Sequence, residues 1–232
     1  LLNLALLTGQ VGRPGCGVSP LRGQNNVQGC GDAGCIPDSL PGYQRYTEAL
    51  PRFEEAWGAE LPSREGLRAT DMVERILSGD IRAMYIVGEN PLLSEPNLHH
   101  AEEALRELDF LVVQDIFLHE TAEIADVVLP ACSFAEKEGT FTNSERRVQR
   151  VRAALPPVGQ GRPDWAIICD LGRRIARRLG VDEGQFVYRS PSEIFDEMAR
   201  LVPFLRGMSY ERLDREGGLQ WPCPEPGHPG TR

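Results

Sequence analysis

Apolar residues between positions 68 and 132 follow a helical period in some segments and form short continuous runs in others. The segment "TDMVERILSGD" places Val73, Ile76 and Leu77 on one helical face, and "AMYIVG" after it is an apolar run of strand length. The order then repeats, with the helix "LHHAEEALREL", the strand "FLVVQD", the short helix "TAEIA" and the strand "DVVLPA". Alternating strands and helices with short connections are typical of a parallel sheet with right-handed crossovers. The pattern predicts an α/β fold with a doubly wound, Rossmann-like parallel sheet, the class to which many dinucleotide-binding domains belong.

The flanking segments have other patterns. Residues 1–7 predict the end of a helix that stops near Gly9, and residues 9–43, rich in Gly, Pro and Asn, predict a loop without regular structure. The segment "PDWAIICDLGRRIARRLG" predicts a helix opened by Pro163, and "SPSEIFDEMARLV" predicts another with Ser192 as its N-cap. The apolar face of the first of these helices is predicted to consist of Trp165, Ile168, Ile175 and Leu179.

These patterns predict four consecutive parts. A helix end and a Gly/Asn-rich loop occupy residues 1–43, an α/β dinucleotide-binding domain residues 44–135, a polar loop and helical segment of a neighbouring domain residues 136–220, and a Pro/Gly-rich linker residues 221–232. The chain opens without Met, directly in the apolar pattern "LLNLALLTG", whose leucines would need a partner. We therefore expect a piece of a longer protein.

Composition narrows the classes of function. The 34 acidic and 25 basic residues give a formal net charge of -9, so no basic surface dominates and nucleic acid is not expected as a partner. Apolar runs are shorter than the roughly 20 residues of a membrane helix, so we expect a soluble, cytoplasmic protein without membrane insertion. The 6 cysteines are irregularly spaced and include no C-x-x-C pair. Reduced thiols are therefore expected, and no metal site made by this chain alone.

Polar side chains follow the predicted strands. In open α/β sheets, ligands bind beyond the carboxyl ends of the strands. The residues predicted at that edge are Glu89, Asn90, Ser94, Gln114 and Asp115. Their carboxylates and carboxamides suit ribose hydroxyls, and a carboxylate matches the adjacent N1–H and N2–H donors of guanine. No G-x-G-x-x-G follows the first strand, so an ordinary NAD site is disfavoured. A plain turn is the competing interpretation of "GENP", and spacing alone predicts a ligand-binding domain without a reaction.

Longer motifs carry a family resemblance. They are "NLALLTGQVGRPGCGVSPLRGQNNVQGCGDAG", "PDSLPGYQ", "GENP", "VVQDIFLHETAEIADVVLPACSFAEKEGTFTNSERRVQ" and "DWAII". In this order they resemble the molybdopterin oxidoreductase superfamily, and within it the catalytic subunit of formate dehydrogenases. Nitrate reductases of that superfamily typically carry Thr-Gly-Gln-Pro-Asn where this chain has "RGQNN", so the resemblance favours formate as substrate.

The resemblance implies roles for individual residues. Arg22 would reach the molybdenum site and hold the carboxylate of formate, for which a planar, always charged guanidinium is suited. Gln24 would contact the pterin. The positions that would contact the guanine dinucleotide are Asn90, Ser94, Gln114, Ala131 through its backbone, and Asp164, with Glu89 and Asp115 as neighbours. Without the resemblance, Arg22 reads as an ordinary salt bridge within a loop.

The resemblance also implies cofactors and partners. The cofactor would be a bis-molybdopterin guanine dinucleotide with molybdenum or tungsten. The 4Fe-4S centre and the Cys or selenocysteine ligand of such subunits would lie in a full-length parent, outside these residues. Expected partners are formate, the remaining domains of the same subunit, and electron-transfer subunits or another acceptor, and we expect no turnover by this segment alone. Two alternatives stay open: another enzyme of the superfamily, and a non-catalytic relative such as the large iron-sulfur subunit of respiratory complex I.

Overall fold

The computed structural model describes residues 1–231. The chain forms two compact units, each built from separated stretches of sequence. The first unit contains residues 1–65, residues 138–151 and the segment from Tyr188 onward, and the second contains residues 66–137 and 152–187. Both units therefore draw on more than one of the four consecutive parts predicted from the sequence.

The second unit contains the predicted alternation of helices and strands. Its elements are α4 (Ala69–Leu77), β1 (Ala83–Val87), α5 (Pro91–Ser94), α6 (Leu98–Arg106), β2 (Phe110–Asp115), α7 (Glu120–Glu123), β3 (Val127–Pro130), η1 (Phe134–Glu136), α8 (Asp164–Leu179) and η2 (Gly184–Phe186). The three strands form a parallel sheet in the order β1-β2-β3. Val87 is in register with Gln114, and Gln114 with Leu129, so the carboxyl ends of the strands meet at one edge. The predicted α/β class and parallel sheet are confirmed.

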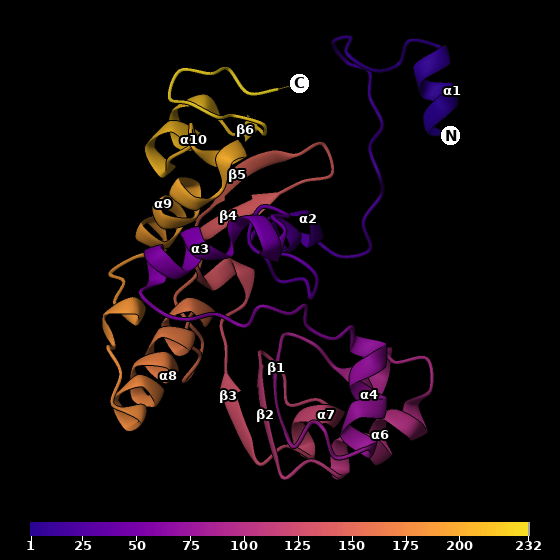
Figure 1. Ribbon diagram of the computed structural model, residues 1–232, viewed down its shortest axis with the longest axis vertical. Helices are drawn as coiled ribbons and strands as arrows, with labels where there is room; N and C mark the ends of the chain where they lie inside the picture. The colour runs from indigo at the N-terminus through magenta and orange to yellow at the C-terminus, as the bar shows by residue number, and fades with distance from the viewer. Residues whose placement is uncertain (232) are drawn as a thin grey trace. The chain divides into compact units, whose positions relative to one another are not determined.

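The core of the second unit lies between this sheet and helices α4, α6 and α7. Figure 1 shows α4 and α6 together on one side of the strands. Val113 of β2 is fully buried, and Ile76 of α4 is 3% exposed. Val73 and Leu77 pack against the same cluster, as the helical spacing predicts. Burial of side chains of this size stabilises the fold by about 1.5–3 kcal/mol each.

The face of α8 differs from the predicted one. Ile168, Ile175 and Leu179 are 44%, 49% and 70% exposed, so the prediction is wrong for these three residues, whereas Trp165 is half-buried. The buried residues of the helix are Ile167, Cys169 and Ala176. The helix also approaches η2 closely, because a Cβ on Gly172 would lie 2.4 Å from the ring of Phe186.

The first unit combines helices with a small antiparallel sheet in the order β4-β5-β6. Its elements are α1 (Leu2–Leu7), α2 (Val27–Asp32), α3 (Tyr46–Trp57), β4 (Gly139–Thr142), β5 (Arg147–Val151), α9 (Pro191–Leu201), η3 (Pro203–Leu205), α10 (Tyr210–Glu216) and β6 (Leu219–Gln220). Val202, Leu213 and Leu205 are at most 1% exposed and lie in one core cluster, and the fully buried Phe53 lies in a second.

Three local predictions in this unit have clear outcomes. The helix at the start of the chain is confirmed as α1, none of whose residues is buried. The prediction of an irregular loop over residues 9–43 is wrong in part, because α2 lies inside it. The glycines of this segment are typical of loops, so the sequence pattern did not indicate a helix. The predicted N-cap Ser192 is also wrong: Ser190 accepts the hydrogen bond from the backbone N–H of Glu193, and Pro191 is the first helical residue. Proline favours that first position, so the cap must precede it.

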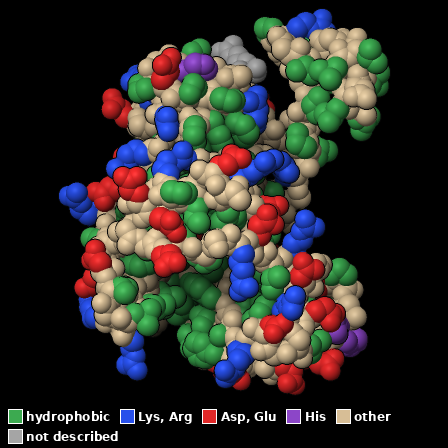
Figure 2. All heavy atoms as spheres, in the orientation of Figure 1, with side chains coloured by type: hydrophobic (Ala, Val, Ile, Leu, Met, Phe, Trp, Pro, Cys, Tyr) green, Lys and Arg blue, Asp and Glu red, His purple; other side chains and the backbone are tan. Residues whose placement is uncertain are grey.

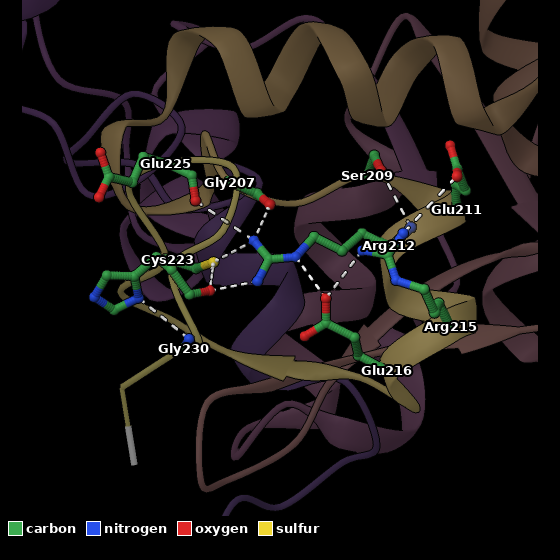
Figure 3. A network of polar contacts seen from close by, with 10 residues as sticks. Gly207, Ser209, Glu211, Arg212, Arg215, Glu216, Cys223, Glu225 and Gly230 are labelled. Carbon is green, nitrogen blue, oxygen red and sulfur yellow. Dashed lines mark hydrogen bonds and ion pairs between the residues drawn. The ribbon is translucent and has the colours of Figure 1, made fainter.

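The segment after α10, predicted to be a linker, is packed around one buried arginine (Figure 3). Arg212 is 8% exposed, and its guanidinium donates hydrogen bonds to its own helix and to the surrounding chain. The acceptors are Glu216 Oε1 at 2.7 Å, Gly207 O at 2.6 Å, Cys223 Sγ and Glu225 O at 3.4 Å each, and His228 O. These bonds fix residues 223–228 to α10, so the tail is part of the folded unit.

Charged side chains of both signs are interspersed on the face of the molecule drawn in Figure 2. On this face neither sign of charge dominates. Among residues 1–231, no helix has both the length and the apolar character needed to cross a membrane.

Candidate functional site

The carboxyl edge of the parallel sheet brings together the residues predicted after β1. Asn90 Nδ2 donates to Glu120 Oε2 at 2.7 Å, and Thr121 Oγ1 donates to Asn90 Oδ1 at 2.7 Å. Ser94 Oγ donates to Glu89 Oε1, also at 2.7 Å. The backbone N–H of Glu120 and the amide of Asn90 lower the pKa of the Glu120 carboxyl, so it is ionised at neutral pH. This edge therefore presents two carboxylates oriented by neutral donors, Glu89 after β1 and Glu120 at the start of α7.

A second group lies at the ends of β2 and α8. Gln114, which is fully buried, donates from Nε2 to Asp164 Oδ1 at 2.7 Å. Lys137 forms an ion pair with the other oxygen of Asp164, and the Tyr85 hydroxyl donates to Gln114 Oε1. Burial, and then the charge of Asp164, raise the pKa of Tyr85, so its phenol stays neutral. The carboxylate of Asp164 is 28% exposed and oriented through both oxygens.

Asp115 shapes the turn after β2. Its Oδ1 accepts from the backbone N–H groups of Ile116 at 2.6 Å and Phe117 at 3.2 Å. Its Oδ2 lies 3.4 Å from His119 Nε2, which makes no hydrogen bond among the described residues. The other ring nitrogen of His119 accepts from the backbone of Ala122 and so caps α7. In the neutral tautomer Nε2 therefore carries the proton and faces Asp115.

Ala131 continues the same edge through its backbone. Its N–H donates to the carbonyl of Asp115 at 3.0 Å, and it forms an isolated parallel bridge with Arg162, just before α8. Gly161 allows this approach, since a Cβ there would lie 3.0 Å from Ala131 O. The seven residues predicted in this unit thus lie on adjoining segments at one edge of the sheet.

Arg22 and Gln24 lie in the first unit, and both are exposed. Arg22 Nη2 donates to Gln28 Oε1 at 2.7 Å. Gln28 is 7% exposed and donates through Nε2 to Asp32 Oδ1 and to the hydroxyl of Tyr43, each at 2.9 Å. Because that amide nitrogen has two acceptors, its oxygen faces Arg22. Arg22 is therefore held by Gln28, whose own position is fixed by Asp32 and Tyr43. The remaining N–H groups of the guanidinium can donate to a carboxylate.

The residues that orient Gln28 are themselves fixed. Burial raises the pKa of Asp32, although hydrogen bonds from Gln28, Tyr43 and Trp221 act against that rise. Burial, followed by the charge of Asp32, raises the pKa of Tyr43 to about 12. Trp221 Nε1 donates to Asp32 Oδ2 at 3.0 Å, which ties the C-terminal segment to α2. Gly31 allows Tyr43 to approach, since a Cβ there would lie 2.6 Å from its hydroxyl.

Sequence reasoning missed several of these residues. They are Gln28, Asp32 and Tyr43 in the first unit and Tyr85, Lys137, His119, Glu120 and Thr121 in the second. A signal existed for the first pair, because Gln28 and Asp32 stand four residues apart and would share a helical face. The prediction of a loop removed that signal.

Comparison with known proteins gives a consistent picture. A family model described as molybdopterin oxidoreductase matches residues 1–174. The chain is 51% identical over 230 residues to F420-dependent formate dehydrogenase 2 subunit alpha of Methanococcus maripaludis, covering 99% of this chain and 33% of that protein. It is 48% identical over 233 residues to the F420-dependent formate dehydrogenase subunit alpha of Methanocaldococcus jannaschii, covering 100% and 33%. The chain thus spans about a third of the length of these relatives.

A solved structure supports the fold. Acetylene hydratase from Pelobacter acetylenicus superposes with a TM-score of 0.52 at 22% identity, covering 76% of this chain and 24% of that one. At this identity the likeness concerns the fold and not the reaction.

Proposed function

Because the chain belongs to the molybdopterin oxidoreductase family, we propose that it is part of a formate dehydrogenase catalytic subunit, which oxidises formate to carbon dioxide by removing two electrons. The names of the relatives at 51% and 48% identity support this assignment. The observation that carries it is the exposed guanidinium of Arg22, which the buried side chain of Gln28 holds in place within the loop "RGQNN".

The second unit fits the guanine end of a molybdopterin guanine dinucleotide. Asp164 uses one lone pair of each oxygen, for Gln114 and for Lys137. A carboxylate has about four lone-pair sites, so its partly exposed face retains acceptors for the N1–H and N2–H of guanine. Asn90, Ser94 and the backbone of Ala131 would complete the site, with Glu89 and Asp115 beside them. This donor and acceptor set suits a purine and a ribose.

When bound, this cofactor, with its molybdenum or tungsten, accepts the two electrons taken from formate. Arg22 binds the formate carboxylate through two parallel N–H···O hydrogen bonds, which fixes the direction of the formate C–H bond. Gln28 holds the guanidinium through Nη2, while Asp32 and Tyr43 keep the Gln28 oxygen turned toward it. Gln24 contacts the pterin. The 4Fe-4S centre, the electron acceptor and a cytoplasmic location are parts of the same proposal for the whole protein.

Substitution of Arg22 in the whole enzyme tests the proposal. Loss of a charged bidentate contact costs about 1.5–3 kcal/mol, so Arg22→Ala should lower kcat/KM for formate by roughly 10- to 100-fold. In Arg22→Lys, kcat/KM for formate should also fall, although less, because lysine keeps the charge and loses the planar fork. Molybdenum content should not change in either variant.

Arg45→Ala is the matched control, because Arg45 is an arginine of the same unit with an 81% exposed side chain, and among residues 1–231 it pairs with Glu48 alone. The control should keep the parent's kinetics. Unchanged formate oxidation in a loaded Arg22→Ala enzyme would remove the substrate role. A loaded parent that oxidises a different substrate would point to another enzyme of the family, and a parent that never loads the cofactor would point to a non-catalytic relative.

A further inference from the structure

Helix α2 ends in a backbone motif that brings two cysteines together. The helix stops at Ala33, and Gly34 adopts a left-handed conformation with φ of 86°. The N–H of Gly34 donates to the carbonyl of Gly31, and the N–H of Cys35 donates to the carbonyl of Cys30, each at 3.0 Å. This pair of bonds defines a Schellman motif, in which the side chains of the first and last residues meet across the final turn. Here those two residues are Cys30 and Cys35.

The thiols of this pair influence each other. The side chains of Cys30 and Cys35 are hydrogen-bonded, and burial, followed by the influence of Cys30, raises the pKa of the Cys35 thiol to about 11. Both residues still expose part of their surface to solvent. By contrast, Cys132, Cys169 and Cys223 are buried. The pair is therefore open to small thiol reagents that cannot reach the buried sulfurs.

The backbone around the pair leaves little freedom to separate the thiols. A side chain at Gly34 would be strained at its positive φ, and its Cβ would lie 2.8 Å from the backbone nitrogen of Pro41. The carbonyl of Asp32, inside the motif, accepts from the N–H of Gly42 at 2.8 Å. The turn is thus packed against residues 41–42, which holds both cysteines at its two ends.

We propose that Cys30 and Cys35 form a reversible disulfide, which makes the end of α2 a redox modification site. The oxidant is a low-molecular-weight disulfide such as oxidised glutathione. The Cys30 thiolate attacks one glutathione sulfur, forming a mixed disulfide and releasing one glutathione thiolate. Cys35 then loses its proton and attacks the Cys30 sulfur, releasing the second glutathione. Two protein thiols are oxidised, one glutathione disulfide is reduced to two thiols, and the two protons pass to the departing thiolates.

The modification would act on the same helix as Gln28, which holds Arg22. A covalent link across the last turn prevents α2 from unwinding at its C-terminal end. The thiol chemistry itself does not depend on the proposed reaction, so failure of one leaves the other standing. The disulfide is detected from the oxidation state of the two sulfur atoms and not from turnover of formate.

Peptide mapping of the whole protein after equilibration with glutathione buffers tests the proposal. Trypsin cuts after Arg22 and Arg45 and so releases both cysteines on one peptide, residues 23–45. An Asp-specific protease then cuts before Asp32, between the two cysteines. In oxidised protein the two cysteine-bearing pieces, residues 23–31 and 32–37, should stay joined until a dithiol reductant is added, and the tryptic peptide should be lighter by two hydrogen atoms. In Cys30→Ser and Cys35→Ser, the remaining cysteine should instead keep a glutathione adduct.

Cys16→Ser is the matched control, because Cys16 is a further exposed cysteine and lies on a different tryptic peptide. The control should cross-link as the parent does. Wild-type protein that carries glutathione on both cysteines, keeps both thiols open to alkylation, or links either one to Cys16 would overturn the assignment.

Discussion

Asp164 offers a test that separates a structural role from recognition of the cofactor. In Asp164→Ala, the buried amide of Gln114 loses the acceptor that lies 2.7 Å from its nitrogen. In Asp164→Asn, the side-chain oxygen can still accept that bond, while the negative charge is gone. If Asp164 binds guanine as proposed, only its carboxylate can accept both N1–H and N2–H. Both variants should then lose guanine recognition, whereas only Ala removes the support of Gln114.

The size of each effect follows from burial. Gln114 is fully buried, so leaving its donor unsatisfied should cost about 1–3 kcal/mol in Asp164→Ala. In Asp164→Asn the lost interaction is the ion pair with Lys137, whose two side chains are each 28% exposed. A pair this open to water contributes at most about 1 kcal/mol. Asp164→Asn should therefore be the more stable of the two variants.

Urea unfolding of the protein without cofactor measures the free energy of unfolding, and guanine nucleotide released from the purified whole enzyme measures retention of the cofactor. We expect the order wild type, Asn, Ala for stability, and a loss of nucleotide in both variants. A loaded Asp164→Asn enzyme with the parent's nucleotide content would refute the guanine role. Equal stability of Asn and Ala would refute the role of Gln114.

Three further predictions concern the first unit. Ser190→Ala should destabilise the protein by about 1 kcal/mol in thermal unfolding, whereas Ser192→Ala should change stability far less, because only Ser190 caps the helix. Arg212→Met should cost about 3 kcal/mol or more by leaving several buried acceptors without a donor, and Arg215→Met, at a 63% exposed side chain, should stay within about 0.5 kcal/mol. The pKa of Cys35 is raised from 9.0 to about 11, so this group stabilises the folded state fully below pH 9.0 and loses that contribution as pH rises through about 11. The rate of alkylation of Cys35, measured on its peptide as a function of pH, should rise near the same shifted pKa.

The parallel sheet was predictable because its signal is local. Each strand is a short apolar run, such as "FLVVQD". In the helices between the strands, apolar residues recur at the helical period. The loop ends that carry Asn90 and Gln114 follow directly from that order. Their hydrogen-bond partners did not, because Glu120 and Asp164 lie 30 and 50 residues further along the chain. Such pairs depend on tertiary packing.

Two failures have a physical origin in small residues. Helix α2 contains two glycines among six residues, which lowers its helix propensity, and tertiary bonds such as Gln28 to Tyr43 stabilise it instead. In α8, hydropathy favoured the face of Ile175, but Gly172 is the position that admits Phe186. The role of Arg22 came only from the family resemblance, since its anchor, Gln28, lay in a segment predicted to be irregular.

We infer that the protein containing this chain oxidises formate. The most direct measurement supplies isotopically labelled formate and a viologen dye to the purified, molybdenum- or tungsten-loaded whole enzyme and quantifies labelled carbon dioxide. We expect labelled carbon dioxide in proportion to the electron pairs that reach the dye, with a steep loss in Arg22→Ala. Loaded enzyme that releases no labelled carbon dioxide, while it reduces or oxidises another substrate of the family, would contradict it.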